Sequence, residues 1–223
     1  MKKLLIGALV LGLASATLAD VILGYDFAGT TTDPELANTV AANVTENSGF
    51  ARTGLGASSS ANAFGGNGWN ITDTFAEGDD YMSFSLTADS GYGLTLTDLT
   101  WSRINASSTG PSNGRWGYRI GAGAWTYQSD FGVTVANASG SWDFADIENT
   151  TSTVEFRFWA YGASGASGTT SSAATGSVTY RNSVAGDDLI LNGSVAVIPE
   201  PGVLALMAFG GLAIVRFARR RAA

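Results

Sequence analysis

Apolar and polar residues alternate along much of the chain between residues 20 and 198. The alternation is clear at residues 81–87, 94–97 and 153–159, and a period of two places successive side chains on opposite faces of a β-strand. Shorter apolar runs bounded by Gly, Asn, Ser and Asp predict further strands at residues 21–27, 99–104, 115–120, 125–127, 132–136, 177–181 and 188–197. Because no long stretch has a helical period, we expect an all-β fold, with two antiparallel sheets packed as a sandwich.

Two segments rich in small polar residues interrupt this pattern. Residues 53–68 and 162–176 consist largely of Gly, Ser, Ala, Thr and Asn. Such composition is typical of surface loops, so both segments are predicted to be loops, the second long enough to border a binding face.

The first residues of the chain follow a different pattern. Lys2 and Lys3 precede an apolar run at residues 4–13, and small residues follow at 14–19. A charged start, an apolar core and a small-residue cleavage site predict a secretory signal peptide over residues 1–19.

The end of the chain is also distinct from the body. An acidic residue stands between two prolines, residues 202–215 are all apolar or glycine, and a cluster of arginines follows. The run is somewhat shorter than the ~20 residues of a typical membrane span, but the adjacent Phe217 and Ala218 extend it. We therefore expect one C-terminal transmembrane helix with its arginines on the cytoplasmic side, as for the lysines of the signal peptide.

The order of these C-terminal features resembles the PEP-CTERM sorting signal of Gram-negative bacteria. The residues that carry the resemblance are Pro199, Glu200, Pro201, Arg216, Arg219, Arg220 and Arg221. The resemblance implies export by the secretion machinery, recognition by an exosortase-type membrane protease, removal of the tail, and release or attachment at the cell surface. An alternative is an ordinary single-span membrane anchor that is not processed. The expected organisation is a signal peptide at 1–19, an exported β-sandwich at 20–197 and a sorting signal at 198–223.

The exported body is strongly acidic. It keeps six arginines and no lysine against 18 of the 19 acidic residues, a formal charge of −12. Such a surface repels phosphate backbones, so nucleic acid is not expected as a partner.

The residue inventory excludes most catalytic chemistry. The chain has no histidine and no cysteine, which removes imidazole-activated nucleophiles and the usual ligands of zinc and redox centres. Carboxylate chemistry remains, as in glycosidases, which set two carboxylates across one sugar bond. The eligible residues are Glu77, Asp79, Asp80, Glu148 and Glu155, but nothing in the sequence places two of them together.

The body also resembles the jelly-roll sandwich of many secreted PEP-CTERM proteins and, more loosely, carbohydrate-binding modules. The resemblance is carried by the GYDFAG motif near the start of the body and by residues 93–101 and 186–193. It implies that a structural calcium ion joins Asp26, near the first strand, to Asp187 or Asp188, at the start of the last. Carboxylates and loop carbonyls suit calcium, while turn formation without a metal is the alternative.

Four aromatic residues near one turn are candidates for a sugar platform. Trp116 and Tyr118 share one face of their strand, Trp125 and Tyr127 share one face of theirs, and a hairpin could bring all four together. The alternative is that they fill the core of a sandwich that has no disulfides. We therefore expect a non-catalytic surface or extracellular-matrix protein, associated with biofilm or exopolysaccharide and able to contact polysaccharide. The alternative is a polysaccharide-degrading enzyme.

Overall fold

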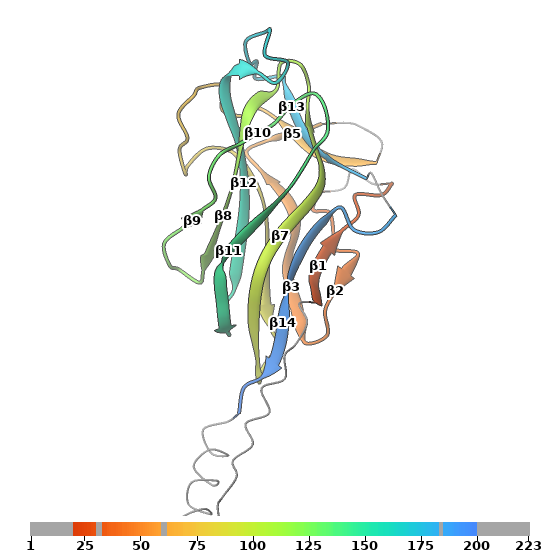
Figure 1. The fold of residues 1–223 in the computed structure, drawn as a ribbon, viewed down its shortest axis with the longest axis vertical. Coiled ribbons are helices and arrows are strands. Elements are labelled where there is room, and N and C mark those ends of the chain that lie inside the picture. The colour runs from red at the N-terminus through yellow and green to blue at the C-terminus, as the bar shows by residue number, and fades with distance from the viewer. Residues whose placement is uncertain (1–19, 30–32, 59–61, 183–184, 200–223) are drawn as a thin grey trace, which may run out of the picture.

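The computed structural model describes residues 20–29, 33–58, 62–182 and 185–199, without the side chain of residue 146. In this part of the chain the named strands form two antiparallel sheets that pack as a sandwich (Figure 1). The predicted all-β sandwich is confirmed. Among the same residues there is no helix long and apolar enough to cross a membrane. The predicted signal peptide and the predicted transmembrane helix lie outside the described residues.

One sheet has eight strands. Its main order is β2 (Thr39–Val40), β1 (Asp20–Tyr25), β14 (Leu189–Val197), β7 (Tyr92–Ala106), β13 (Ser177–Arg181), β5 (Ala63–Asn67) and β4 (Gly56–Ala57). The eighth strand, β11 (Ala138–Thr150), also pairs with β7.

The other sheet has six strands. Its main order is β10 (Phe131–Gly132), β8 (Pro111–Ile120), β12 (Val154–Gly165), β6 (Tyr81–Ala88) and β3 (Val44–Thr53), and β9 (Thr126–Tyr127) also pairs with β8. In this sheet β12 lies centrally between β8 and β6.

The alternating pattern of β6 shows how the sequence sets the two faces of this sheet. Met82, Phe84 and Leu86 are fully buried, whereas Tyr81 and Ser83, in the alternate phase, are only half-buried. The buried phase packs against residues of the eight-stranded sheet, since Phe84 contacts Tyr25. We call this the inner face and the opposite one the outer face.

Aromatic rings fill the centre of the core. The Phe50 and Tyr180 ring centroids are 5.2 Å apart, and Phe158 lies 5.4 Å from both Tyr180 and Trp116. Burying a large apolar side chain contributes about 1.5–3 kcal/mol. This packing stabilises a chain that has no cysteine for disulfides.

The prediction of a loop at residues 53–68 is wrong, because this segment contains β4 and β5. Its glycines fit a strand whose neighbour approaches closely. A Cβ on Gly65 would lie 2.3 Å from Thr179 Cγ2 and 2.6 Å from the Val178 carbonyl oxygen in the adjacent β13. Here glycine serves close strand packing rather than a turn.

Both described ends of the body lie at the same end of the sandwich (Figure 1). Asp20 pairs with Gly193 on β14, and Ile198 donates its backbone N–H to the Gly91 carbonyl at 2.9 Å. Gly91 lies in the turn between β6 and β7, so the chain continues from the end of the sandwich where β6 finishes.

Candidate functional site

A second group of aromatic residues covers the outer face of the six-stranded sheet. Phe156 and Phe158 of β12 point into the core, which directs Trp159 and Tyr161 of the same strand outward. These two outward side chains are nevertheless only 1% and 3% exposed. Other aromatic residues surround them, and we call the whole set the outer ring cluster: Phe75, Tyr81, Trp125, Tyr127, Trp159 and Tyr161.

Trp159 lies at the centre of the outer ring cluster. Its ring centroid is 5.4 Å from Phe75, 5.4 Å from Trp125, 5.9 Å from Tyr127 and 6.0 Å from Tyr81. The contacts with Phe75, Trp125 and Tyr127 are edge-on, a favoured arrangement for aromatic pairs. Trp159 therefore holds the rings around it in place.

Phe75 comes from the loop between Trp69 and Asp80, which is fixed against the sheet. The Ala163 N–H donates to Asp73 Oδ1 at 2.8 Å, and Asn70 forms an isolated bridge with Tyr161. Within the loop, Asn70 Nδ2 donates to Asp79 Oδ2 at 2.6 Å. The loop thus forms one border of the outer ring cluster.

The rings of Trp125 and Tyr127 form a nearly parallel pair. Their ring centroids are 6.5 Å apart and their planes differ by 21°. Both side chains are half-buried, and they project on the same side because they stand two residues apart.

The sheet supports this pair from beneath. A Cβ on Gly117 would lie 2.9 Å from Tyr127 Cδ1 and 3.1 Å from Trp159 Cζ3, so Tyr127 lies against a position without a side chain. The guanidinium carbons of Arg119 and Arg157 lie 4.9 and 4.6 Å from the Trp125 ring centroid. Since these three supporting residues belong to β8 and β12, they contact the pair from the sheet side.

Three ion pairs accompany the rings. Glu155 accepts hydrogen bonds from Arg119 Nε at 2.8 Å and from Arg157 Nε at 2.6 Å, one on each carboxylate oxygen. Arg115 Nε donates to Asp130 Oδ1 at 2.6 Å. Arg157 also lies 3.9 Å from the Tyr81 ring centroid, and such contacts are attractive because the face of an aromatic ring is electron-rich.

The titratable groups with shifted pKa values keep their ordinary charge at neutral pH. Burial, with the hydrogen bond to Glu77 at 2.7 Å, raises the pKa of Tyr127 to about 12. Burial and Asp130 raise the pKa of Tyr161 to about 12. Burial opposes ionisation of Asp130 and Arg115, but their mutual hydrogen bond, their charge attraction and Tyr161 together outweigh it, so that the pKa of Asp130 is lowered and that of Arg115 is raised. These four groups are therefore suited to hydrogen bonding rather than to proton transfer near pH 7.

The four aromatic residues singled out in the sequence divide between the two faces of the sheet. Trp116 is 0% exposed and packs in the core, and Tyr118 is 8% exposed and contacts Trp142. The register explains the division, because β9 pairs Tyr127 with Gly117. Gly117 alternates with Trp116 and Tyr118, so Tyr127 lies on the opposite face. The structure thus brings together Trp125 and Tyr127 but not all four.

Several residues of the outer face were missed from the sequence: Phe75, Tyr81, Trp159, Tyr161, Arg115, Arg119 and Arg157. One signal was available in the alternation of β12. With Phe156 and Phe158 in the apolar phase, Trp159 and Tyr161 occupy the phase that normally carries polar side chains. Aromatic residues in the outward phase indicate a covered or binding surface.

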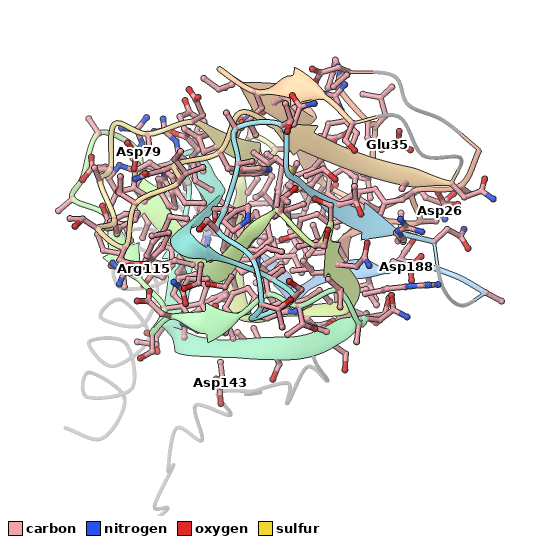
Figure 2. The ribbon with its side chains drawn as sticks, turned by 90° about the horizontal axis from the view of Figure 1, so that it is seen from above. Asp26, Glu35, Asp79, Arg115, Asp143 and Asp188 are labelled. Atoms are coloured by element: carbon pink, nitrogen blue, oxygen red, sulfur yellow. The ribbon has the colours of Figure 1, made fainter. Side chains whose placement is uncertain are left out.

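The predicted calcium ligands have protein partners. Asp26 Oδ1 accepts the Ala28 N–H at 2.9 Å, and Asp187 Oδ1 accepts from Asn38 at 3.0 Å. Asp188 is 2% exposed and accepts from the Ser102 hydroxyl. Across the described ranges, three or more His, Cys, Asp or Glu side chains do not gather as a metal site, and calcium binding stays a prediction. Figure 2 shows Asp26 and Asp188 on the side of the sandwich opposite Asp79 and Arg115.

Of the carboxylates considered for catalysis, three lie in the loop before β6, one in β12 and one in β11. Glu77 accepts from Tyr127, Glu155 is paired with two arginines, and Asp79 accepts from Asn70. Asp80 borders Gly54, and Glu148 is exposed on β11 of the other sheet. Of the predicted sorting signal only Pro199 is described; Glu200, Pro201 and the four arginines lie outside the described residues.

No family model matches this chain, and no curated protein matches it. Among solved structures it is similar to a mutant family 29 carbohydrate-binding module complexed with mannohexaose. The two share 11% sequence identity and a TM-score of 0.40, over 79% of this chain and 93% of that chain.

Proposed function

We propose that this chain is an exported, non-catalytic protein that binds polysaccharide on the outer face of its six-stranded sheet. The observation that carries the proposal is the nearly parallel pair of half-buried rings, Trp125 and Tyr127, supported by Gly117, Arg119 and Arg157. The C–H faces of a sugar ring stack on aromatic faces, and aromatic side chains offer large rigid contact areas at a low cost in conformational entropy.

The polar groups beside the pair suit sugar hydroxyls. Arginine carries five N–H donors and a carboxylate accepts several hydrogen bonds. Glu77, Arg119 and Glu155 lie around the two rings through their contacts with Tyr127, Trp125 and each other. Apolar stacking with polar groups at its border is the usual composition of a small-ligand site.

The binding experiment uses a glycan array and then titration of the glycans retained. Trp125→Ala should weaken binding at least tenfold, about 1.4 kcal/mol, since truncating an aromatic anchor commonly costs more than 1 kcal/mol. Ile120→Ala is the matched control, because it removes a partly exposed apolar side chain from the same sheet. Equal binding by wild type and Trp125→Ala, or the absence of any retained glycan, would refute the proposal.

Export is proposed on the residue pattern of the two ends of the chain. The mature protein should lack residues 1–19 and the arginines of the sorting signal, having been cut by an exosortase-type protease and placed at the cell surface or in the matrix. Intact-mass measurement of the protein from its native host tests this. A molecule that retains Arg221 would instead be a single-span membrane-anchored protein.

A further inference from the structure

The charged groups of the outer ring cluster cancel. Three arginines, Arg115, Arg119 and Arg157, stand among the rings, together with three carboxylates, Glu77, Asp130 and Glu155. We propose that the ligand of this face is an uncharged polysaccharide, bound through at least two consecutive sugar rings. This inference rests on the proposed function and specifies the class of ligand.

Each arginine of this face already has a carboxylate partner. Arg119 and Arg157 share Glu155 at 2.6 Å each, and Arg115 pairs with Asp130 at 2.6 Å. An anionic ligand that displaced a carboxylate from such a pair would leave that carboxylate desolvated without its partner, and an anionic ligand that did not displace it would lie beside a like charge. The ion pairs therefore disfavour uronate or sulfate groups at this face.

Acidic residues around the rings also oppose the binding of an anionic ligand. The loop that borders the rings carries Asp73, Asp79 and Asp80, and the body as a whole is strongly acidic. A polyanion approaching the rings meets a negative potential, which lowers both its rate of association and its affinity. An uncharged chain does not meet this barrier.

The paired arginines and carboxylates can still form hydrogen bonds with a neutral sugar. Arg157 donates through Nε to Glu155 and Arg115 donates through Nε to Asp130, although each guanidinium carries five donors. Sugar hydroxyls both donate and accept, so they can bond guanidinium and carboxylate groups without breaking the ion pairs.

The geometry of the aromatic pair gives the minimum length of the ligand. The ring centroids of Trp125 and Tyr127 are 6.5 Å apart, and their planes are nearly parallel. One sugar ring stacks on one aromatic ring, so both stack only when the ligand presents two successive rings in an extended chain. A monosaccharide uses half of the platform.

The first experiment compares soluble neutral glucan and mannan with alginate and polygalacturonate, by affinity electrophoresis and calorimetry at 20 and 300 mM NaCl. The neutral polymers should be retained with less than a twofold change between the two salt concentrations, and the uronates should bind at least tenfold more weakly. Uronates retained more strongly, and released by salt as screening increases, would overturn the inference.

Measuring uronate binding by the Trp125→Ala variant distinguishes a wrong ligand class from failure of the proposed function. If uronates bind and Trp125→Ala abolishes their binding, the face binds polysaccharide and only the ligand class proposed here is wrong. If Trp125→Ala binds every polymer as the wild type does, the proposed function itself fails.

A ladder of neutral oligosaccharides tests the two-ring requirement. Affinity should rise at least tenfold from the monosaccharide to the trisaccharide, and Tyr127→Ala should remove most of this rise. Equal affinity along the ladder would contradict binding across both rings.

A charge variant tests the cancellation directly. Glu155→Gln keeps the shape of the side chain and makes the charge of the face more positive by one unit. It should increase the ratio of uronate binding to neutral-glycan binding at least threefold at low salt. Glu148→Gln makes the same charge change on the other sheet and should increase it less. Equal gains in both variants would contradict the inference, and thermal unfolding of each variant verifies that it is folded.

Discussion

The hydroxyl group of Tyr180 provides a sharp test of the core packing. Its ring lies at 5.6 Å from Phe27, 5.2 Å from Phe50 and 5.4 Å from Phe158. The side chain is fully buried, and within the part of the chain that the structure describes its hydroxyl has no hydrogen-bond partner. We predict that Tyr180→Phe stabilises the protein.

The magnitude follows from two opposing contributions. Burying a hydroxyl without a partner costs about 1–3 kcal/mol in proteins. Removing its oxygen leaves a void no larger than a methyl group, which costs up to about 1 kcal/mol. The expected gain is about 1 kcal/mol, or about 2–4 °C in Tm for a domain of this size.

Tyr25→Phe is the matched control because it removes the same atom from a satisfied position. The Tyr25 hydroxyl donates to Glu46 Oε1 at 2.7 Å, and a hydrogen bond to a charged group contributes about 1.5–3 kcal/mol. This variant should therefore lose stability where Tyr180→Phe gains it. Calorimetry and urea unfolding at pH 7 measure both changes.

Alkaline pH should enlarge the benefit of Tyr180→Phe. Burial raises the pKa of Tyr180 well above 10.0, so the folded protein keeps the phenol protonated while the unfolded chain ionises. The stability due to the protonated phenol is complete below about pH 10 and decreases as pH rises toward the folded pKa, by about 1.4 kcal/mol per unit. Urea unfolding at pH 10 to 11 should show the variant losing stability less steeply than the wild type. A variant that is less stable than wild type at pH 7 would show that Tyr180 has a partner and refute the argument.

Two further predictions concern the outer face and the metal. Gly117→Ala should lift the Tyr127 ring from the sheet, because the new Cβ would approach Tyr127 Cδ1 to 2.9 Å. Overpacking should lower the stability by about 1–3 kcal/mol, and the affinity for neutral glycans should fall about tenfold. Unchanged affinity in a titration would contradict the proposed contact of the ligand with Tyr127. Calcium at Asp26, Asp187 and Asp188 should raise Tm at millimolar concentration and chelator should reverse this, since a ligand of the native state stabilises it. Asp187→Asn should abolish the shift, and a Tm indifferent to calcium in the wild type would refute the site.

The strictly alternating strand β6 was predictable from the sequence, whereas two strands with several register shifts, β3 and β11, were not. β6 keeps a strict period of two along its whole length, which is why it was recognised. β3 pairs with β6 through shifts of register near Glu46 and Ser48, and β11 pairs with β7 through three such shifts. An extra residue in a strand reverses the phase of every side chain that follows, so these two strands show no continuous alternation and were missed.

The outer ring cluster was only partly predictable, because its members converge from distant parts of the chain. Trp125 and Tyr127 stand close in sequence, and the period of two placed them together. Phe75 reaches the cluster through the packing of its loop. Whether Trp125 lies on the same face of the sheet as Trp159 depends on how β9 pairs with β8. These depend on long-range pairing that no local pattern records.

The position of the outer ring cluster also suits a body that remains attached through its C-terminal end. β6 runs from Tyr81, a member of the cluster, to Ala88, next to the turn where Ile198 is bonded. The register places Tyr127 level with Ser83 of β6, through Gly117 and Arg157. At about 3.3 Å per residue, Ser83 lies about 16 Å along the strand from Ala88. A glycan chain on Trp125 and Tyr127 therefore lies away from the continuation of the chain. Immobilising the body through a tag after Pro199 should preserve glycan binding, whereas attachment through a cysteine introduced at Asp73, beside the rings, should block it; equal binding in both orientations would place the ligand on another face.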